Sequence, residues 1–222
     1  LGKDAMGTPV EIEYAVDLKK DSEGKASFYI LQIKPLIQAG FDCNIELKSI
    51  KKDSIILYSE KGMGNGIIND IVDVIYANID RFDKSETIEM AREIEEINEY
   101  MINQNRKYVL IGPGRWGTRD RWIGIPVKWH MISNARIIVE SSLDDYPLDA
   151  SSGSHFFHNV TSMNVGYFTV QPELLVSYIK YNTLDKQNVI RNGKYFNHVR
   201  FKKPLSIMMD GKQRIYLIKQ ND

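Results

Sequence analysis

Four polar side chains near the start of the chain have the types and spacing of a metal and phosphate site. Glu11 and Glu13 lie two residues apart in one alternating segment, and Gln32 and Lys34 lie two residues apart in a second. Because side chains two residues apart on a strand share a face, pairing of the two segments would bring carboxylates, an amide oxygen and an ammonium group together. Mg²⁺ accepts such oxygens together with substrate phosphates, and a lysine can offset the charge of a transferring phosphoryl group. The alternative is a solvated polar face on an edge hairpin.

A second candidate site is the loop of residues 112–122, which is rich in arginine and glycine. Its three arginines can bind phosphate or carboxylate: Arg115, Arg119 and Arg121. Its three glycines allow close approach of the backbone to a ligand: Gly112, Gly114 and Gly117. The loop lacks the Gly-Lys-Ser/Thr ending of a Walker A motif. The alternative is a structural loop whose arginines pair with Asp120 or Asp144.

Two histidines, His155 and His158, form a third feature. Their spacing would place both on one face of a helix, where they could hold a metal ion. Carboxylates nearby in the sequence could complete such a site: Asp144, Asp145 and Asp149. The simpler interpretation is that both histidines are structural or orient a ligand.

The chain begins with a predicted antiparallel hairpin. Apolar and polar residues alternate over Val10–Leu18, a polar turn with Gly24 follows, and Ser27–Ile33 predicts a second strand. A short polar connection between two such segments is typical of a hairpin.

The rest of the sequence predicts a mixed α/β domain. An amphipathic helix is expected over Ser85–Asn105 with Ser85 as its N-cap, and a buried strand follows at Tyr108–Ile111. Further strands are expected in four segments: Ile45–Tyr58, Ile67–Tyr76, Ala135–Glu140 and Val165–Val170. The dipeptides Asn192-Gly193 and Asp210-Gly211 predict tight hairpins. We therefore expect an α/β fold (mixed α+β), an antiparallel hairpin followed by a larger mixed-sheet domain.

The composition indicates a globular cytoplasmic protein without a membrane segment. Hydrophobic residues make up 43% of the chain and charged residues 26%. Cys43 is the only cysteine, and the first residues lack the pattern of a signal peptide. The 29 basic and 29 acidic residues balance, which argues against a nucleic-acid-binding domain. This balance disfavours the hypothesis that nucleic-acid bases stack on Trp116 and Trp122.

Residues 6–36 resemble the end of the ATP-grasp nucleotide domain in phosphoenolpyruvate synthases and pyruvate phosphate dikinases. The resemblance rests on two segments, Met6-Gly7-Thr8-Pro9-Val10-Glu11-Ile12-Glu13-Tyr14 and Leu31-Gln32-Ile33-Lys34-Pro35. The family shows a small-residue and proline turn, an acidic-Ile-Glu-aromatic strand, a loop, and a Leu/Val-Gln-x-Arg-Pro strand. The resemblance thus covers about one seventh of the chain.

The resemblance implies an ATP-dependent phosphotransferase that uses Mg²⁺ and a small acid such as pyruvate. It implies that Glu13 and Gln32 are metal ligands at the ATP phosphates and that Lys34 contacts the transferring group. The family usually has arginine at the position of Lys34, and lysine offers a point charge where arginine offers a planar fork. The adenine-binding part would lie upstream, so these 222 residues alone are expected to be inactive.

On this interpretation, residues 1–40 are the C-terminal piece of a nucleotide-binding domain, and residues 41–222 are a mixed α/β domain that binds an anion. A phosphohistidine domain follows in the family, which makes His155 a candidate phosphocarrier because Ser154 precedes it as in the Ser-His pair of that domain. The alternative function is a non-catalytic, anion- or nucleotide-binding regulatory module, with Arg115, Arg119 and Arg121 as its site.

Overall fold

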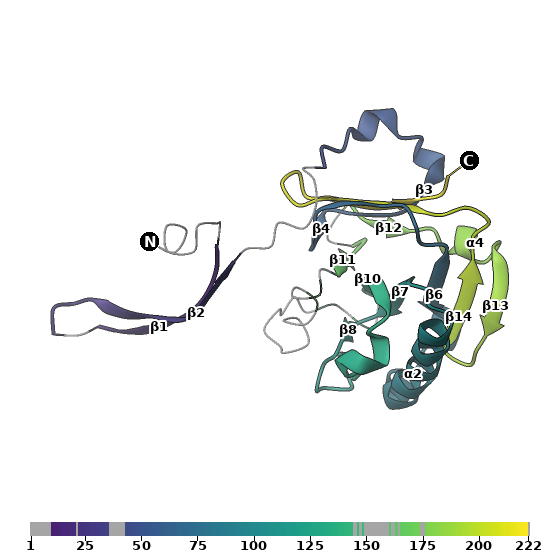
Figure 1. Ribbon diagram of the computed structural model, residues 1–222. Coiled ribbons are helices and arrows are strands. Elements are labelled where there is room, and N and C mark those ends of the chain that lie inside the picture. Colours follow the sequence, from purple (N-terminus) through teal and green to yellow (C-terminus); the bar gives the residue numbers. More distant parts are fainter. Residues whose placement is uncertain are drawn as a thin grey trace. The chain divides into compact units, whose positions relative to one another are not determined.

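The computed structural model describes residues 10–20, 22–35, 43–143, 146, 148, 160, 163, 165–173 and 176–221. The chain divides into two compact units, Leu1–Ala39 and Gly40–Asp222 (Figure 1). No helix among the described residues is long and apolar enough to span a bilayer.

The first unit is the predicted antiparallel hairpin. Strand β1 (Val10–Lys20) pairs with β2 (Ala26–Pro35). The turn between them contains Gly24 at a φ of +78°, a conformation that favours glycine. Tyr14 stacks on Phe28 with their ring centroids 4.9 Å apart. The described side chains of the hairpin are mostly exposed, and two strands alone bury too little apolar surface for independent stability.

The second unit is built around a seven-stranded mixed sheet. In spatial order its strands are β13 (Asn188–Asn192), β14 (Phe196–Arg200), β6 (Asp73–Ala77), β7 (Tyr108–Pro113), β10 (Ala135–Ser141), β11 (Gly166–Val170) and β4 (Lys61–Met63). Strands β6, β7, β10 and β11 are parallel and lie in chain order, whereas the flanking strands run antiparallel. The carboxyl ends of four strands therefore meet at one edge of the sheet.

A five-stranded antiparallel sheet covers one face of this mixed sheet (Figure 1). Its strands, in spatial order, are β12 (Tyr178–Ile179), β3 (Ile55–Ser59), β16 (Ile215–Lys219), β15 (Ser206–Asp210) and β5 (Gly66–Ile68). The core between the sheets includes Leu57, Ile137 and Phe168, which are fully buried. Parallel strands are covered on both faces in nearly all proteins, and here a second sheet supplies one of the two covers.

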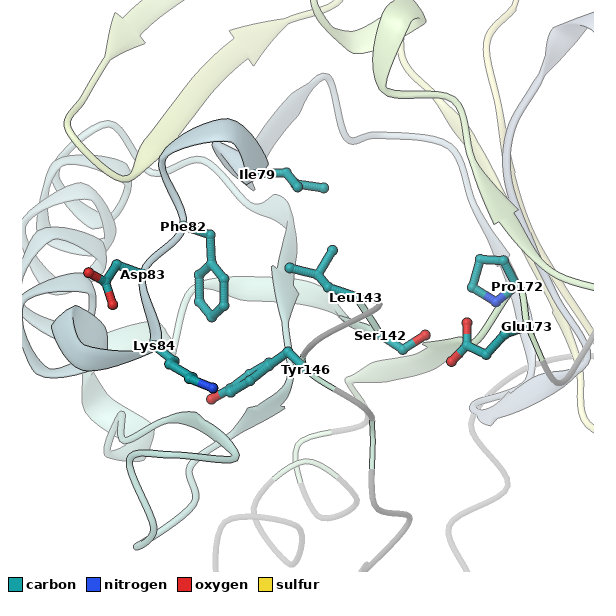
Figure 2. A pocket seen from close by; sticks show the side chains of 9 residues that line it. All are labelled: Ile79, Phe82, Asp83, Lys84, Ser142, Leu143, Tyr146, Pro172 and Glu173. Carbon is teal, nitrogen blue, oxygen red and sulfur yellow. The ribbon is translucent and has the colours of Figure 1, made fainter.

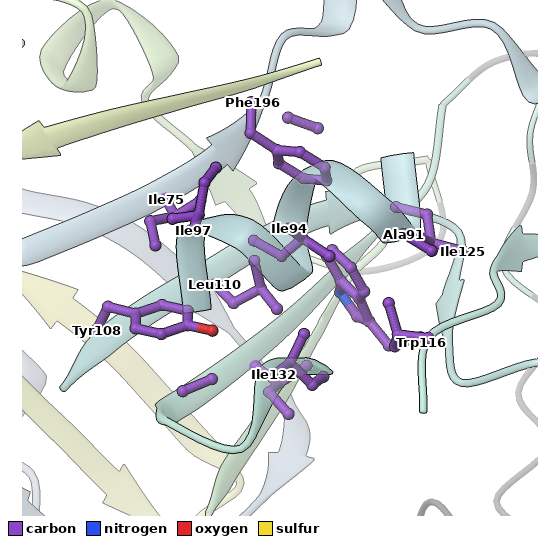
Figure 3. Close-up of a cluster of buried hydrophobic side chains, with 14 of the residues drawn as sticks. Ile75, Ala91, Ile94, Ile97, Tyr108, Leu110, Trp116, Ile125, Ile132 and Phe196 are labelled. Carbon is purple, nitrogen blue, oxygen red and sulfur yellow. The ribbon is translucent and has the colours of Figure 1, made fainter. Parts of the chain in front are cut away.

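Helix α2 (Thr87–Asn103) covers the other face, because its apolar residues recur every three or four positions. Met90, Ile94, Ile97 and Met101 are buried, and they belong to one core cluster with side chains of β7 and the loop that follows it (Figure 3). Full burial of such a side chain contributes roughly 1.5–3 kcal/mol.

The prediction of this helix was right about its existence and wrong about its cap. The helix starts at Thr87, and Glu86 is its N-cap without a side-chain hydrogen bond. Ser85 instead lies in a 3₁₀ turn, where its backbone N–H donates to the Asp83 side chain at 2.8 Å. The aspartate two residues earlier therefore performs the role expected of the serine.

Two other predicted segments differ from the structure. Only Ile55–Ser59 of the segment Ile45–Tyr58 is a strand, because 3₁₀ turns occupy Leu47–Ser49 and Lys52–Ser54. The segment Ile67–Tyr76 divides between β5 and β6, which belong to different sheets. The two tail hairpins are confirmed as the pairs β13–β14 and β15–β16.

The remaining elements are short. They are the strands β8 (Arg115–Trp116) and β9 (Gly124–Ile125), the helix α4 (Tyr181–Leu184), and 3₁₀ turns at Ile79–Arg81, Lys84–Glu86 and Trp129–Ile132. Strands β8 and β9 pair in parallel within the loop that follows β7.

A buried carboxylate, Asp73, at the amino end of β6, joins this strand to β14 and to the segment that precedes β7. It accepts hydrogen bonds from Arg106 at 2.7 Å, from Arg200 at 2.8 Å and, across 2.8 Å, from the ring of His198. Burial alone would raise the pKa of Asp73, but the three donors outweigh it and hold the pKa at about 2. Its contribution to stability is therefore present above its ordinary pKa and is lost as the pH falls toward 2.

We expect Asp73→Asn to lower the free energy of unfolding by about 2–4 kcal/mol, because it takes the anionic acceptor away from two partly buried guanidinium groups and a buried imidazole ring. Urea unfolding at neutral pH measures this change. Asp80→Asn, at an exposed position, is the matched control and should stay within about 0.5 kcal/mol of the parent. A loss below about 1 kcal/mol for Asp73→Asn would show that the cluster contributes little.

Candidate functional site

The hairpin register brings together the four positions that the sequence analysis assigned to a metal and phosphate site. Glu13 pairs with Gln32 across the two strands, and Glu11 pairs with Lys34 two positions further along, beyond the pair of Ile12 and Ile33. The predicted convergence of carboxylate, amide and ammonium positions is thus present in the backbone. The side chains of Glu13 and Gln32 are exposed.

A β-bulge lies directly beside this pair. Glu13 is opposite Gln32 but Tyr14 is opposite Ile30, so Leu31 is an extra residue on β2. Bulges redirect neighbouring side chains and are frequent next to active sites.

The residues present fit an Mg²⁺ ion that is held mainly by its substrate. The described residues contain no group of three or more histidine, cysteine or acidic side chains that could form a closed metal site. Glu13 and Gln32 would supply two oxygens, and Mg²⁺ commonly takes one or two protein carboxylates and completes its shell with phosphates and water.

A cavity of about 1040 Å³ lies at the carboxyl ends of the parallel strands in the second unit (Figure 2). The segment after β6 contributes Ile79, Phe82, Asp83 and Lys84, the segment after β10 contributes Ser142, Leu143 and Tyr146, and the segment after β11 contributes Pro172 and Glu173. Ligands of open α/β sheets bind outside the carboxyl ends of the strands, and the cavity lies at this edge.

Two residues that line the cavity carry hydroxyl oxygens that are closed off from it and have no hydrogen-bond partner among the described residues. Tyr146 is 3% exposed and Ser142 is 8% exposed, yet neither the Tyr146 Oη nor the Ser142 Oγ is paired. Burial, and then the charge of Asp120, raises the pKa of Tyr146, so its hydroxyl stays protonated near neutral pH.

Gly114, in the loop after β7, packs directly against the ring of Tyr146. The Gly114 N–H donates to the Ser141 carbonyl at 2.9 Å, and Gly114 has a φ of +68°. A Cβ atom at Gly114 would lie 2.1 Å from the Cε1 atom of Tyr146. Glycine is therefore required here both by the backbone conformation and by the tyrosine ring.

A buried carboxyl, Glu140, lies one residue before the end of β10. Its Oε1 accepts hydrogen bonds from the Trp116 N–H at 2.9 Å and from the Tyr167 hydroxyl. Burial raises the pKa of Glu140 to about 6, although both donors and the charges of Arg115 and Lys61 act in the opposite direction. A carboxyl that titrates near neutrality is a candidate proton donor or acceptor.

The three arginines of the predicted anion loop have different surroundings. Arg115 is half-buried, and its charge acts on Glu140. Arg119 is exposed. Arg121 donates from Nη2 to the Ser85 carbonyl at 2.9 Å and lies 4.9 Å from the ring centroid of Trp122. The described contacts therefore do not place the three guanidinium groups around one centre, and a shared anion remains a prediction.

Comparison with protein-family models, with curated proteins and with solved structures finds no match to this chain.

Sequence reasoning missed three groups of this site. His155 and His158, which the sequence analysis named, fall outside the described residues. Glu140 could have been noticed, because it is an acid at the end of an otherwise apolar strand, Ala135–Ser141. No local sequence pattern marks Ser142 and Tyr146, because the lack of a hydrogen-bond partner depends on the folded surroundings of each hydroxyl.

We expect Glu140→Gln to change the pH dependence of folding. Between the ordinary carboxyl pKa and about 6 the folded state binds the proton more tightly than the unfolded state does, so the stability from this group is full at low pH. It is lost as the pH rises through 6, by about 2 kcal/mol. Urea unfolding of both proteins from pH 4 to 8 measures the difference.

The substitution isolates the charge, because both hydrogen bonds reach Oε1 and a glutamine carbonyl oxygen can accept them equally. The stability of the parent relative to Glu140→Gln should therefore fall over this interval. A constant difference would mean that Glu140 titrates at an ordinary pKa.

Proposed function

We propose that the chain is part of an ATP-dependent phosphotransferase of the phosphoenolpyruvate synthase and pyruvate phosphate dikinase type, with ATP, Mg²⁺ and a small acid such as pyruvate as its partners. The observation that carries this proposal is the cross-strand register of the hairpin, which pairs Glu13 with Gln32 and Glu11 with Lys34. A hairpin shifted by one residue would place these side chains on opposite faces.

The surface of the hairpin supports its origin in a larger nucleotide lobe. Nine large apolar side chains of the hairpin are exposed: Ile12, Tyr14, Val16, Leu18, Phe28, Tyr29, Ile30, Leu31 and Ile33. Contiguous exposed apolar surface of this kind normally packs on another part of a protein. We infer that the hairpin completes a lobe whose other parts bind the adenine.

Each polar position has a role in the proposed chemistry. Glu13 and Gln32 would hold the metal ion, which would neutralise phosphate charge when bound. Lys34 would contact the transferring phosphoryl group and offset its charge. The bulge at Leu31 lies directly beside the pair of Glu13 and Gln32, and it would orient Gln32 relative to Glu13.

The test is Mg·ATP turnover, with and without pyruvate, by the whole natural chain that contains these residues. We expect Glu13→Gln to reduce turnover by about 100-fold or more, because it removes a charged metal ligand while keeping the size of the side chain. Lys34→Arg should retain turnover, since it restores the residue usual in the family and keeps the charge. Formation of AMP identifies the reaction class.

Glu23→Gln is the matched control, because it makes the same chemical change in the same hairpin at an exposed turn residue that pairs with Lys25. It should leave turnover unchanged. Absence of ATP binding and cleavage by the parent chain would overturn the proposal, and equal effects of the two glutamate variants would remove Glu13 from the site.

A second candidate is a non-catalytic, anion-binding regulatory module in residues 41–222. One observation favours it, because the Nε of Arg121 is buried and has no acceptor among the described residues. An anion could accept from this N–H, and Arg115 belongs to the same loop. Arg115→Ala distinguishes the candidates: it should weaken phosphate binding in the regulatory case and leave ATP turnover unchanged.

A further inference from the structure

One end of the five-stranded sheet is rich in lysine. Ile55, the first residue of β3, pairs with Lys219 at the end of β16, and Lys219 also pairs with Ser206 at the start of β15. Lys180 follows β12, and its backbone N–H donates to the Ile56 carbonyl at 2.8 Å. Helix α4 and the C-terminus lie at the same end of this sheet (Figure 1). The segments at this end contain six lysines, which together are called the basic end: Lys52, Lys180, Lys186, Lys202, Lys203 and Lys219.

The protein leaves most of this positive charge without a counter-ion. Five of the six lysines make no ion pair among the described residues: Lys52, Lys180, Lys186, Lys202 and Lys219. The Lys180 ammonium donates instead to the carbonyls of Lys52 at 2.9 Å and Asp53 at 3.4 Å. Three aspartates lie in or beside these segments, so the lysines outnumber them two to one: Asp53, Asp70 and Asp185.

The acidic residues that balance these lysines lie elsewhere in the chain. Three acids of helix α2 and its N-cap already pair with cations: Glu89 with Arg92, Glu96 with Arg191, and Glu86 with Lys194. The equality of 29 basic and 29 acidic residues therefore describes the whole chain and not its basic end. Lysines clustered on one face are typical of a surface that binds a nucleic acid.

A small cavity of about 210 Å³ lies within the basic end. Lys202 and Lys203 line it together with three amide side chains, Gln187, Gln220 and Asn221. Gln187 and Asn221 each donate to a backbone carbonyl, and an amide nitrogen carries a second N–H group. The cavity is smaller than a usual small-molecule site, so it suits one anionic group of a larger ligand. Lysine and amide groups are among the side chains that contact backbone phosphates in nucleic-acid complexes.

The density of the lysines favours a nucleic-acid duplex over an acidic polypeptide. From β12 to β15 the basic end spans three strand spacings, roughly 14 Å. A duplex carries about one charge per 1.7 Å of its axis, so roughly eight phosphates fall within this length and about four face the protein. An extended peptide advances about 3.3 Å per residue with alternate side chains on one face, so it presents about two carboxylates over the same length. Six lysines match the duplex better.

The aromatic side chains at this end are not exposed for stacking on bases. Phe201 is buried, and Tyr178 and Tyr181 are half-buried. Proteins that bind single strands commonly stack the bases on aromatic side chains. The described surface therefore suits a duplex, whose bases stack on one another and whose phosphates face outward.

We propose that the basic end binds the phosphate backbone of a nucleic-acid duplex without reading its sequence, and that the small cavity takes one phosphate group. The lysines neutralise phosphates and release the counter-ions that surround them, so the affinity depends steeply on salt. The surface uses no residue of the hairpin, so a test of it is independent of the test of phosphoryl transfer.

The experiment measures binding of a fluorescent DNA duplex of about 20 base pairs to the whole chain by anisotropy, from about 20 to 200 mM NaCl. The logarithm of the affinity should fall linearly with the logarithm of the salt concentration, with a slope of about −4 for four neutralised phosphates. A second duplex of unrelated sequence should bind equally well. The double variant Lys52→Gln and Lys202→Gln should weaken binding about tenfold at low salt and make the slope less steep by about 2.

Two exposed lysines on the side of helix α2 provide the matched control, because their replacement changes the net charge equally. Lys128 directly precedes the 3₁₀ turn Trp129–Ile132, in which the His130 carbonyl accepts from Asn98 of α2, and Lys107 directly precedes β7. The double variant Lys107→Gln and Lys128→Gln should bind the duplex as the parent does. Both double variants should keep the melting temperature of the parent, so a change in affinity reports lost contacts and not unfolding.

Three outcomes would overturn the proposal. The first is that the parent chain does not bind the duplex at the lowest salt concentration. The second is that polyglutamate or vesicles with anionic lipid headgroups bind more tightly than the duplex, which would assign the basic end to an acidic protein or to a membrane surface. The third is that the two double variants lose affinity equally, which would show that only the net charge matters.

Discussion

Burial of both faces of the four parallel strands is the constraint on which the second unit depends. Helix α2 covers one face and the five-stranded sheet covers the other, so the strands β6, β7, β10 and β11 present polar groups only at their ends. The four strands are wound in chain order and have no reversal point at which a crevice would open. Residues that follow β6, β10 and β11 line a cavity at this edge.

Two buried carboxyls, one at each end of the parallel strands, have pKa values that are shifted in opposite directions. Asp73, at the amino end of β6, accepts hydrogen bonds from two guanidinium groups and from the ring of His198, and these donors lower its pKa to about 2. Glu140, near the carboxyl end of β10, accepts from two neutral donors, and burial raises its pKa to about 6. A carboxylate that is always charged can join strands, whereas one that titrates near neutrality can exchange a proton.

Local patterns determined which elements could be predicted. The alternation in Val10–Leu18, the helical spacing in α2 and the Asn-Gly and Asp-Gly turns are properties of neighbouring residues, and the elements they predict are present. The segment Ile67–Tyr76 was predicted as one strand, and it fails because β5 and β6 join different sheets. That separation depends on which distant strands each half contacts, which no short window of sequence contains.

The candidate site follows the same division. The convergence of Glu13 and Gln32 was predictable, since it needs only the period of two and a hairpin register. The unpaired hydroxyls of Ser142 and Tyr146 were not, because an absent partner is a property of the folded surroundings. The arginine loop was conspicuous in the sequence. In the structure, Arg121 donates to the Ser85 carbonyl and the charge of Arg115 acts on Glu140, so both side chains interact with the protein itself.

The charged groups of both candidate sites are exposed. The hairpin presents exposed polar positions that include charged groups, where attraction for a metal and its phosphates would outweigh a small cost of dehydration. The charged residues that line the strand-end cavity, Asp83, Lys84 and Glu173, are exposed as well, whereas the hydroxyl oxygens of Ser142 and Tyr146 are closed off from it. Water and salt weaken the attraction between exposed charges, so recognition at either site would depend on several weak contacts made together.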